Sequence, residues 1–417
     1  MPDAFAKVTM VGLGYIGLPT AALMASRGLE VIGLDINQEA VDTINAGGVH
    51  IVEPDLDIVV RSVVTTGNLR ATTQVEPSDA FLVAVPTPII GDTHTPDLSY
   101  IKSAVESIAP VLEKGNLLVL ESTSPVGTTE KMAAWLAALR PDLTFPQEAG
   151  KDADVQLAYC PERVLPGHVL QELVNNDRII GGMSSRCVER ATALYKVFVK
   201  GECIATTVRT AELCKLTENA YRDVNIAFAN EMSLVCDSLE VDVWELIALA
   251  NRHPRVNILQ PGPGVGGHCI AVDPWFIVDS VPERAHLIRT AREVNDSKPH
   301  HVVARIMDKA ARFKAPNIAV FGLAFKPNID DLRESPSVAI VADLASRLEG
   351  QILIVEPNIA ELPQALSGYP ALRLVAQADA LEHADIVVGL VDHTEFLSIR
   401  REALSEKVII DTRGMWR

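Results

Sequence analysis

The segment that most constrains the fold lies near the start of the chain, where "VTMVGLGYIGLPTAALMASRGLEVIGLD" spans residues 8–35. An apolar strand runs into Gly12-x-Gly14-x-x-Gly17, a helical pattern follows, and a second apolar strand ends at Asp35. A strand, glycine turn, helix and strand in this order predict a doubly wound, mostly parallel sheet that binds a dinucleotide.

Each residue of this turn has its own physical task. Gly12 permits the tight turn, Gly14 lets a pyrophosphate approach the backbone, and Gly17 lets helix and strand pack closely. The following helix presents the positive end of its dipole to the phosphates. Asp35, 18 residues after Gly17, can accept hydrogen bonds from a ribose diol and would repel a 2′-phosphate. The turn therefore favours NAD over NADP, and the alternative is a purely structural glycine-rich turn.

Size and charge narrow the class of protein. With 417 residues, the chain exceeds a single ordinary core, so we expect two or three domains. The formal net charge of −17 argues against nucleic acid or an anionic membrane as a partner. An anionic small molecule remains compatible, because a local group of Arg and Lys can bind a phosphate.

The six cysteines include no C-x-x-C pair, and we expect them to be reduced thiols in a cytoplasmic protein. The first residues lack a basic segment followed by an unbroken apolar run, so no signal peptide is expected. No apolar run approaches the ~18 residues of a membrane span.

Two further apolar strands, within residues 80–88 and 116–130, end in loops rich in Thr, Ser and Pro. Ligands bind at the carboxyl ends of strands in open α/β sheets. Thr87, Thr123 and Thr129 are therefore candidate hydroxyl contacts to a cofactor or substrate. Helix capping and turn formation are equally good reasons for threonine at these positions.

Residues 209–252 show helical periodicity without Pro or Gly, which predicts a long helix that joins two domains. Lys215, Asn219 and Arg222 are spaced i, i+4, i+7 and share one face of it. Taken alone, this polar face could simply be solvated.

The last part of the chain contains a second strand–loop–helix–strand unit, in residues 315–358, whose loop carries Lys326 and Arg333 instead of glycines. We therefore predict an α/β fold with two doubly wound nucleotide-binding domains joined by a long central helix and a helical domain. The expected boundaries are 1–205, 206–312 and 313–417.

A lone cysteine within "GPGVGGHCIAVDP", residues 262–274, is the main candidate nucleophile. The glycines before it leave backbone NH groups unobstructed. If a helix began near His268, Cys269 would lie in its first turn, where the dipole stabilises a thiolate. Asp273 would then lie on the same face, placed to orient water or act as a base. The alternative is a glycine-rich turn with a buried cysteine.

A zinc site is the other chemistry to consider here, because His268 and Cys269 are adjacent. Adjacent residues seldom reach one ion together, and no second Cys/His pair has ligand spacing. We expect no metal.

A hydride-accepting cofactor together with a nucleophilic thiol suggests a four-electron oxidation. An alcohol becomes an aldehyde, the thiol captures it as a thiohemiacetal, a second oxidation leaves a thioester, and water releases an acid. A single oxidation would need no thiol.

The sequence resembles the UDP-glucose/GDP-mannose dehydrogenase family along nearly its whole length. The resemblance is carried by "GLGYIGLPTA", "VPTP", "ESTSPVGTTE", "CPERVLPG", "AELCKLTENAYRDVNIAFANE", "GPGVGGHCIAVDP" and "GLAFKPNIDDLRESP". Within the family it is similar to the branch that oxidises 2-acetamido sugars. This implies NAD-dependent oxidation of UDP-N-acetyl-D-mannosamine at sugar carbon-6, with UDP-N-acetylglucosamine as the alternative substrate. It also implies a homodimer whose substrate site is shared across subunits.

The resemblance also implies roles for single residues. Cys269 matches the family's nucleophile, Lys215 and Asn219 match the residues that stabilise the oxyanion, and Asp273 and Thr123 match those that hold the hydrolytic water. Glu162 matches a position linked to acid–base work. The substrate-binding matches are Arg163, Val164, Arg222, His253, Arg255, Gly266, Phe325 and Lys326, with Lys215 and Asn219. The cofactor-binding matches are Gly12, Gly14, Tyr15, Ile16, Gly17, Asp35, Thr87, Thr129 and Arg333.

Two departures from the UDP-glucose type concern the sugar pocket. Pro166 stands where that type has a second Glu, and Val272 stands where it has Lys before the aspartate. A smaller, less charged wall could make room for an acetamido group. Two other functions remain open, namely a single-step NAD-dependent hydroxyacid dehydrogenase and a non-catalytic sensor of NAD or nucleotide sugars.

Overall fold

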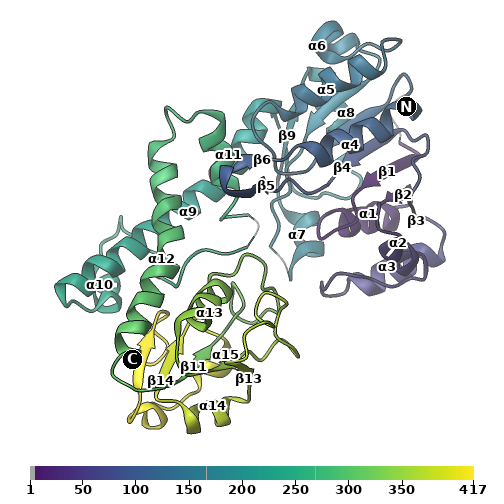
Figure 1. The fold of residues 1–417 in the computed structure, drawn as a ribbon. Helices are drawn as coiled ribbons and strands as arrows, with labels where there is room; N and C mark the ends of the chain where they lie inside the picture. Colours follow the sequence, from purple (N-terminus) through teal and green to yellow (C-terminus); the bar gives the residue numbers. More distant parts are fainter. Residues whose placement is uncertain (1–4, 166, 268) are drawn as a thin grey trace. The chain divides into compact units, whose positions relative to one another are not determined.

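The structure is a computed structural model that describes residues 5–165, 167–267 and 269–417. The chain divides into two compact units, residues 1–217 and 218–417 (Figure 1). Pro166 and His268, on which parts of the sequence interpretation rest, lie outside the described residues.

The described part of the first unit contains an eight-stranded sheet with the order β10-β9-β8-β7-β4-β1-β2-β3. Its strands are β1 Lys7–Val11, β2 Glu30–Leu34, β3 Leu69–Thr72, β4 Ala80–Val83, β7 Leu117–Leu120, β8 Gln156–Tyr159, β9 Arg178–Gly182 and β10 Cys203–Thr207. All neighbours pair in parallel except β8 and β9, which pair antiparallel. From β3 to β8 the order is that of a dinucleotide-binding sheet, which confirms the predicted fold class.

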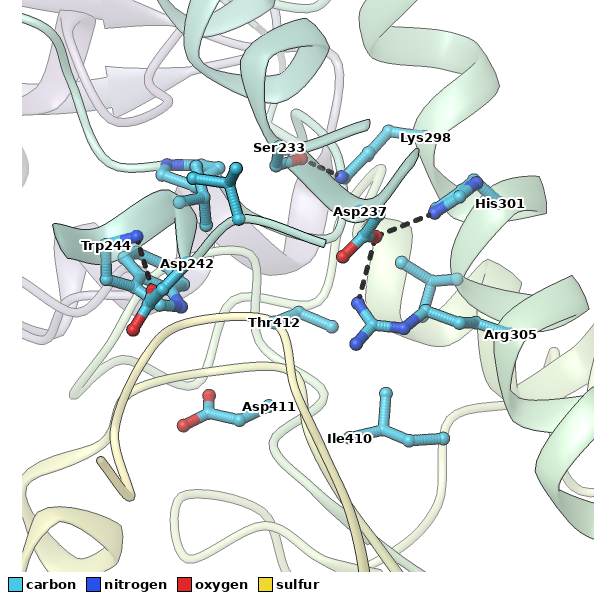
Figure 2. Close-up of a pocket in the computed structure, with 14 residues that line it drawn as sticks. Ser233, Asp237, Asp242, Trp244, Lys298, His301, Arg305, Ile410, Asp411 and Thr412 are labelled. Carbon is cyan, nitrogen blue, oxygen red and sulfur yellow. Dashed lines mark hydrogen bonds and ion pairs between the residues drawn. The ribbon is translucent and has the colours of Figure 1, made fainter. Parts of the chain in front are cut away.

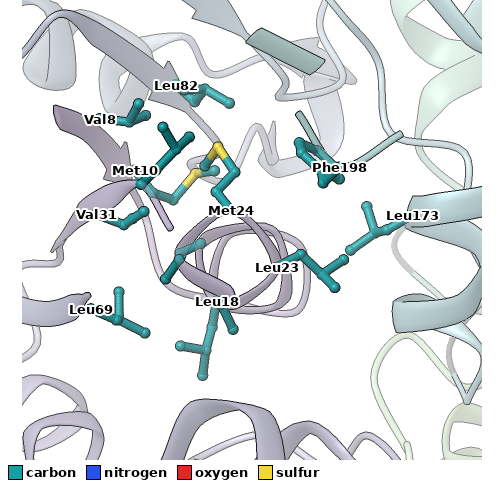
Figure 3. Close-up of a cluster of buried hydrophobic side chains, with 14 of the residues drawn as sticks. Val8, Met10, Leu18, Leu23, Met24, Val31, Leu69, Leu82, Leu173 and Phe198 are labelled. Atoms are coloured by element: carbon teal, nitrogen blue, oxygen red, sulfur yellow. The ribbon is translucent and has the colours of Figure 1, made fainter. Parts of the chain in front are cut away.

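Helices cover both faces of this sheet, because its central strands are apolar on both sides. In β4, Ala80 and Leu82 face one core while Phe81 and Val83 face the other. The first core includes α1 side chains such as Leu18 and is shown in Figure 3. The helices here are α1 Gly17–Ser26, α2 Gln38–Asn45, α3 Leu56–Thr65, α4 Ser99–Ile108, α5 Thr128–Leu139, α6 Pro146–Ala149, α7 Val169–Asn175 and α8 Ser185–Tyr195, and a short hairpin is formed by β5 Ile89–Ile90 and β6 Thr95–Pro96.

The long helix predicted from periodicity is present but shorter than expected. Helix α9, Val208–Leu239, begins in the first unit and ends in the second. Glu240 then adopts a positive φ of 56°, and the Asp242 side chain accepts hydrogen bonds from the first backbone NH groups of α10, Val243–Ala250. The single helix expected over residues 209–252 was therefore wrong at its end, because an N-cap aspartate starts a new helix without Gly or Pro.

The second unit continues with α11 Asp273–Ser280 and α12 His286–Ala310, and α12 runs through Pro299 without ending. A five-stranded, all-parallel sheet follows in the described residues, with the order β13-β12-β11-β14-β15. Its elements are β11 Asn317–Phe321, α13 Pro336–Arg347, β12 Gln351–Val355, β13 Leu372–Leu374, α14 Gln377–His383, β14 Ile386–Gly389, α15 Thr394–Leu397 and β15 Val408–Asp411. The second doubly wound domain is confirmed.

Candidate active site

The glycine turn after β1 has the geometry that its sequence predicts. Gly12 has φ +90°, and its NH donates to the carbonyl of Leu34 at 2.8 Å. A Cβ on Gly12 would lie 2.5 Å from the Ala84 carbonyl oxygen, and a Cβ on Gly17 would lie 1.8 Å from the Gly12 carbonyl oxygen. A Cβ on Gly14 would meet no atom within 4 Å. Gly12 and Gly17 are thus required by packing, whereas the space at Gly14 is open for a phosphate.

The acid at the end of β2 lies against the same turn. One oxygen of Asp35 accepts the Leu13 NH at 2.8 Å, and the other accepts the Asn37 NH at 2.9 Å. Its carboxylate is partly exposed beside the start of α1, where Tyr15 is exposed and Ile16 is half-buried. These residues fit an adenosine ribose and a pyrophosphate, so the chemistry of the donors suits NAD.

The predicted Thr87 and Thr123 lie in the loops that follow β4 and β7, and Thr129 lies in the first turn of α5. The hydroxyl groups of Thr87 and Thr129 have protein partners. Thr87 Oγ1 donates to the carbonyl of Thr123 at 2.5 Å, which links the two loops. Thr129 is fully buried, and its hydroxyl donates to Glu212 at 2.7 Å. Glu212 also accepts the backbone NH groups of Gly127 and Thr129 at 2.6 and 2.9 Å. The Glu212 carboxylate, which belongs to α9, therefore caps the start of α5. Lys215, which is half-buried, follows Glu212 by three residues in α9.

Glu212 had no signal in the sequence, because the residues that it contacts are more than eighty positions away. Burial raises the pKa of its carboxyl, while the hydrogen bonds from Thr129 and Gly127 oppose that shift. Its contacts attach the first turns of α9 to the first sheet, and they thereby fix Lys215 relative to the loop after β7.

The loop that follows β8 contains the predicted Glu162, which belongs to a buried cluster with Arg178, Tyr195 and Glu121, three residues that the sequence did not indicate. The guanidinium of Arg178 donates to Glu162 Oε2 at 2.5 Å, and the backbone NH of Arg163 donates to Glu162 Oε1 at 2.6 Å. The Arg178 guanidinium lies over the Tyr195 ring, 5.4 Å from its centroid, and Tyr195 donates to Glu121 at 2.5 Å. Both oxygens of Glu162 are engaged, so this carboxylate orients its own loop, which continues into the half-buried Val164.

In the second unit, the turn that carries Cys269 differs from expectation. Helix α11 begins at Asp273, with Val272 as its N-cap residue, so Cys269 lies in a turn before the helix and not in its first turn. The helical spacing is nevertheless kept, because the Asp273 NH donates to the Cys269 carbonyl at 2.9 Å. Cys269 is exposed, whereas Asp273 is 3% exposed and accepts the amide of Asn219 at 2.5 Å.

The glycines before Cys269 are explained by close packing. A Cβ on Gly266 would lie 2.6 Å from the Glu334 carbonyl oxygen and 2.8 Å from the Phe325 side chain. Gly267 has φ +82° and lies against the same ring. The segment therefore packs on the loop after β11, and it brings Gly266 and Phe325 together. Lys326 is exposed and lies 5.5 Å from the Phe325 ring centroid.

The remaining predicted residues of the second unit lie on its surface. Arg222, His253 and Arg255 are exposed, and the Arg255 NH donates to the His253 ring at 3.3 Å. Arg333 is also exposed, and its guanidinium pairs with Asp331 at 2.6 Å. Contacts of these four side chains with a ligand remain predictions.

A cavity of about 190 Å³ lies elsewhere in the second unit, between α9, α10, α12 and the end of β15 (Figure 2). On its α12 side, His301 and Arg305 pair with Asp237 at 3.3 and 3.2 Å. Lys298 bonds the Ser233 hydroxyl, and burial lowers the pKa of this lysine to about 8. None of the predicted catalytic or substrate residues lines this cavity.

The described residues contain neither a group of metal ligands nor a membrane-spanning helix. Within residues 5–165, 167–267 and 269–417, no three His, Cys, Asp or Glu side chains are grouped so as to hold a metal ion. In the same residues, no helix has both the length and the apolar character needed to cross a bilayer.

Comparison with known proteins covers almost the entire chain. Residues 6–199 match the NAD binding domain of the UDP-glucose/GDP-mannose dehydrogenase family, residues 209–297 its central domain, and residues 319–417 its UDP binding domain. The chain is 64% identical over 412 residues to the NDP-N-acetyl-D-galactosaminuronic acid dehydrogenase of Ralstonia nicotianae, covering 99% of this chain and 96% of that protein.

It is 61% identical over 423 residues to the UDP-N-acetyl-D-mannosamine dehydrogenase of Salmonella typhi, covering 99% of this chain and all of that protein. A solved structure of the Staphylococcus aureus UDP-N-acetyl-mannosamine dehydrogenase superposes with a TM-score of 0.87 at 42% identity, covering 98% of this chain and 95% of that chain. This chain therefore belongs to the UDP-glucose/GDP-mannose dehydrogenase family and is an NAD-dependent UDP-sugar dehydrogenase.

Proposed function

We propose that this dehydrogenase oxidises UDP-N-acetyl-D-mannosamine at sugar carbon-6 to the uronate, through a covalent intermediate on Cys269. The observation that carries the proposal is the turn before α11. There an exposed thiol is followed by a buried carboxylate, Asp273, which Asn219 holds at 2.5 Å. The 61% identical relative named for this substrate supports the choice of sugar.

The proposed chemistry on the sulfur has three stages. The Cys269 thiolate adds to the carbon-6 aldehyde and gives a thiohemiacetal, whose oxidation leaves a thioester. Water then attacks the thioester carbonyl, the C–S bond breaks, and the thiolate leaves with release of the acid. NAD, when bound, supplies the hydride acceptor for each of the two oxidations.

Five other residues have proposed roles in these stages. Asp273 accepts a proton from the hydrolytic water, with Thr123 as a second partner for that water. Lys215 and Asn219 stabilise the oxyanions that form on carbon-6. Glu162 is retained as a candidate for acid–base work, although its ion pair with Arg178 favours a role in holding the 162–164 loop.

The proposed binding residues form two groups, one for NAD and one for the substrate. Gly12, Gly14, Gly17 and Asp35 form the proposed NAD site, together with Tyr15, Ile16, Thr87, Thr129 and Arg333. Arg163, Val164, Arg222, His253, Arg255, Gly266, Phe325 and Lys326 form the proposed substrate site. We keep the domain boundaries 1–205, 206–312 and 313–417 as part of this proposal, with a cytoplasmic location that would keep Cys269 reduced.

A homodimer with a shared substrate site is part of the same proposal. Tyr221, Phe228 and Val235 recur every seventh residue along α9 and are 69%, 53% and 39% exposed. A seven-residue spacing places them on one face of the helix, and large exposed apolar side chains in a row indicate a contact surface. A second copy of α9 is the proposed occupant, because an identical stripe is complementary to itself under two-fold symmetry.

UDP-N-acetylgalactosamine is a second candidate substrate. It is favoured by the 64% identical relative, whose name refers to an N-acetyl-D-galactosaminuronic acid. Both candidates carry a 2-acetamido group, so they share the proposed space near Val272 and differ only in hydroxyl and substituent orientation. UDP-N-acetylglucosamine, the carbon-2 epimer of the first candidate, belongs to the same comparison.

The deciding experiment measures NADH formed from UDP-N-acetyl-D-mannosamine, UDP-N-acetylglucosamine, UDP-N-acetylgalactosamine and UDP-glucose in parallel. With each sugar limiting, we expect two NADH per molecule of the preferred acetamido sugar and uronate as the product. One NADH per sugar would support single-step oxidation instead. No NADH from any of the four would indicate a sensor, and equal turnover of UDP-glucose would overturn the proposed acetamido pocket.

A further inference from the structure

The glycine-rich segment that leads to Cys269 is held at both ends by side chains from two long helices. At its start, the Gly262 NH donates to Asn230 Oδ1 of α9 at 2.9 Å. At its end, Arg292 of α12 reaches the carbonyl of Ile270, the residue after Cys269, through a long contact of 3.5 Å. The described residues between these points, 262–267 and 269–270, are called the collar.

These two anchors belong to one buried network. Asn230 donates to Asn295 at 2.8 Å, and Asn295 donates to Asp223 Oδ1 at 2.8 Å. Arg292 completes the network with an ion pair to Asp223 at 2.6 Å. All four side chains are at most 1% exposed. The network therefore connects Gly262 to Ile270 without passing through solvent.

The network is poorly suited to stabilising the fold alone. In the described part of the chain, Asp223 Oδ2 and Arg292 Nε are buried without a hydrogen-bond partner. Burial raises the pKa of the Asp223 carboxyl, while the Arg292 charge opposes that shift. Buried ion pairs can often be replaced by apolar side chains without loss of stability. A buried, incompletely satisfied network at this place thus calls for a reason other than stability.

We propose that Asp223, Arg292, Asn295 and Asn230 are positioning residues that fix the collar and thereby the direction of the Cys269 sulfur. This inference rests on the proposed function, in which Cys269 is the nucleophile. None of the four needs to touch substrate or cofactor. Their action is on the backbone at both ends of the collar, and the glycines between these ends would otherwise leave the backbone free to move.

The same face of α9 also positions the carboxylate beyond the cysteine. Asn219 lies one helical turn before Asp223 and donates to Asp273 at 2.5 Å. Side chains of α9 therefore hold both the collar and the carboxylate of Asp273, which is proposed to orient water. Since a displacement of 1 Å at a reacting group can reduce rate by about a hundredfold, such shared anchoring has a direct kinetic consequence.

The test compares Asn230→Ala and Asp223→Asn with Ser233→Ala. Ser233 is also buried on α9, its hydroxyl is bonded by Lys298 of α12, and it donates to the backbone carbonyl of Asn230 at 2.6 Å. Its side-chain hydrogen bonds go to α9 and α12 and not to collar atoms, so it is the matched control. We expect kcat for uronate formation to fall at least about tenfold in the network variants, with KM for NAD and substrate changed less than about threefold. Ser233→Ala should retain the wild-type kcat.

A second measurement separates positioning from folding. Alkylation of Cys269 by iodoacetamide, followed by peptide mass spectrometry on the native enzyme, should show an altered rate in both network variants and an unchanged rate in Ser233→Ala. If Asp223→Asn does not fold, Asn230→Ala carries the test, because it removes no charge. Arg292→Lys keeps a positive charge beside Asp223, but a lysine cannot also reach the Ile270 carbonyl. We therefore expect its kcat to fall below the wild-type value, as in the other network variants.

The outcomes distinguish this inference from the proposed function. Network variants that melt at lower temperature but keep wild-type kcat and alkylation rate would show a purely structural role and overturn the inference. Full uronate formation by Cys269→Ser would instead overturn the proposed function, whatever the network variants do.

Discussion

Glu121, the residue that follows β7, carries a buried carboxyl whose pKa lies near neutrality. It is 3% exposed, and its Oε2 has no partner in the described residues. Burial raises its pKa to about 7, against the opposing effects of the Arg178 charge and the Tyr195 hydrogen bond. Its charge therefore changes near neutral pH.

Replacing this carboxyl should reveal a pH-dependent contribution to stability. Because the pKa is higher in the folded protein than in the unfolded chain, folding is favoured most at low pH, and that advantage is lost as pH rises from about 4.5 to about 7. Glu121→Gln, which cannot ionise, should gain stability relative to wild type over this range, by up to about 3 kcal/mol. Urea unfolding at pH 5, 6, 7 and 8 measures the difference.

Glu76→Gln provides a control of opposite sign. Hydrogen bonds from Arg70 and Lys7 lower the pKa of the Glu76 carboxyl to about 2, so its contribution is present above the unfolded-state pKa and lost as pH falls toward 2. A Glu121→Gln curve that runs parallel to wild type from pH 5 to 8 would show that Glu121 does not titrate there.

At the scale of elements, the two doubly wound domains use the same turn after their first strands. Gly322 has φ +96° and donates to the Val355 carbonyl at 2.9 Å, as Gly12 does to Leu34. The Leu323 NH donates to Glu356 at 2.7 Å, as the Leu13 NH does to Asp35. The difference lies in the acid, since Glu356 is buried and also bonded to His393, which leaves it no surface for a ribose.

The glycines of the first turn should separate cofactor binding from folding. Gly14→Ala adds a Cβ to open space, so stability should stay close to wild type while KM for NAD rises at least about tenfold. Gly17→Ala places a Cβ 1.8 Å from a carbonyl oxygen and should lower the melting temperature. Thermal unfolding and NAD titration check both, and an unchanged NAD affinity in Gly14→Ala would contradict the assignment of this turn.

The elements show how far sequence patterns reach. The first turn was predictable because its parts lie within residues 8–35. The end of α9 was not, because Glu240 takes a left-handed conformation without glycine. Helix α12 gives the reverse case, since Pro299 lies inside it. Its ring would approach a Cβ on Gly264 to 3.1 Å, so this proline packs on the collar and does not end the helix.

At the scale of the whole chain, the division into two nucleotide-binding folds and a long helix followed from the sequence, but the buried polar contacts did not. Glu212 and Thr129 are 83 positions apart, and Asp223 and Arg292 are 69 apart. No periodicity or spacing relates residues at such distances. The sequence therefore predicted the candidate chemistry at Cys269, Asp273 and Asn219, whereas the residues that hold these groups required the structure.

The assembly of two chains can be tested on α9. Phe228→Glu places a charge in the middle of the exposed stripe, and sedimentation velocity should show a shift from dimer to monomer. Leu287→Glu is the control, because Leu287 lies outside α9 and is even more exposed than Phe228, 68% against 53%. If the substrate site is shared, the monomeric variant should lose most of its turnover. A dimer that persists in Phe228→Glu would place the contact elsewhere.

The most direct measurement for the central claim is mass spectrometry of the enzyme quenched during turnover with UDP-N-acetyl-D-mannosamine and NAD. Asp273→Asn should slow thioester hydrolysis and let the intermediate accumulate. The account predicts a peptide containing Cys269 with the added mass of the nucleotide-sugar acyl group, which disappears as uronate is released. Continued formation of uronate with no adduct on the Cys269 sulfur in either enzyme would contradict it.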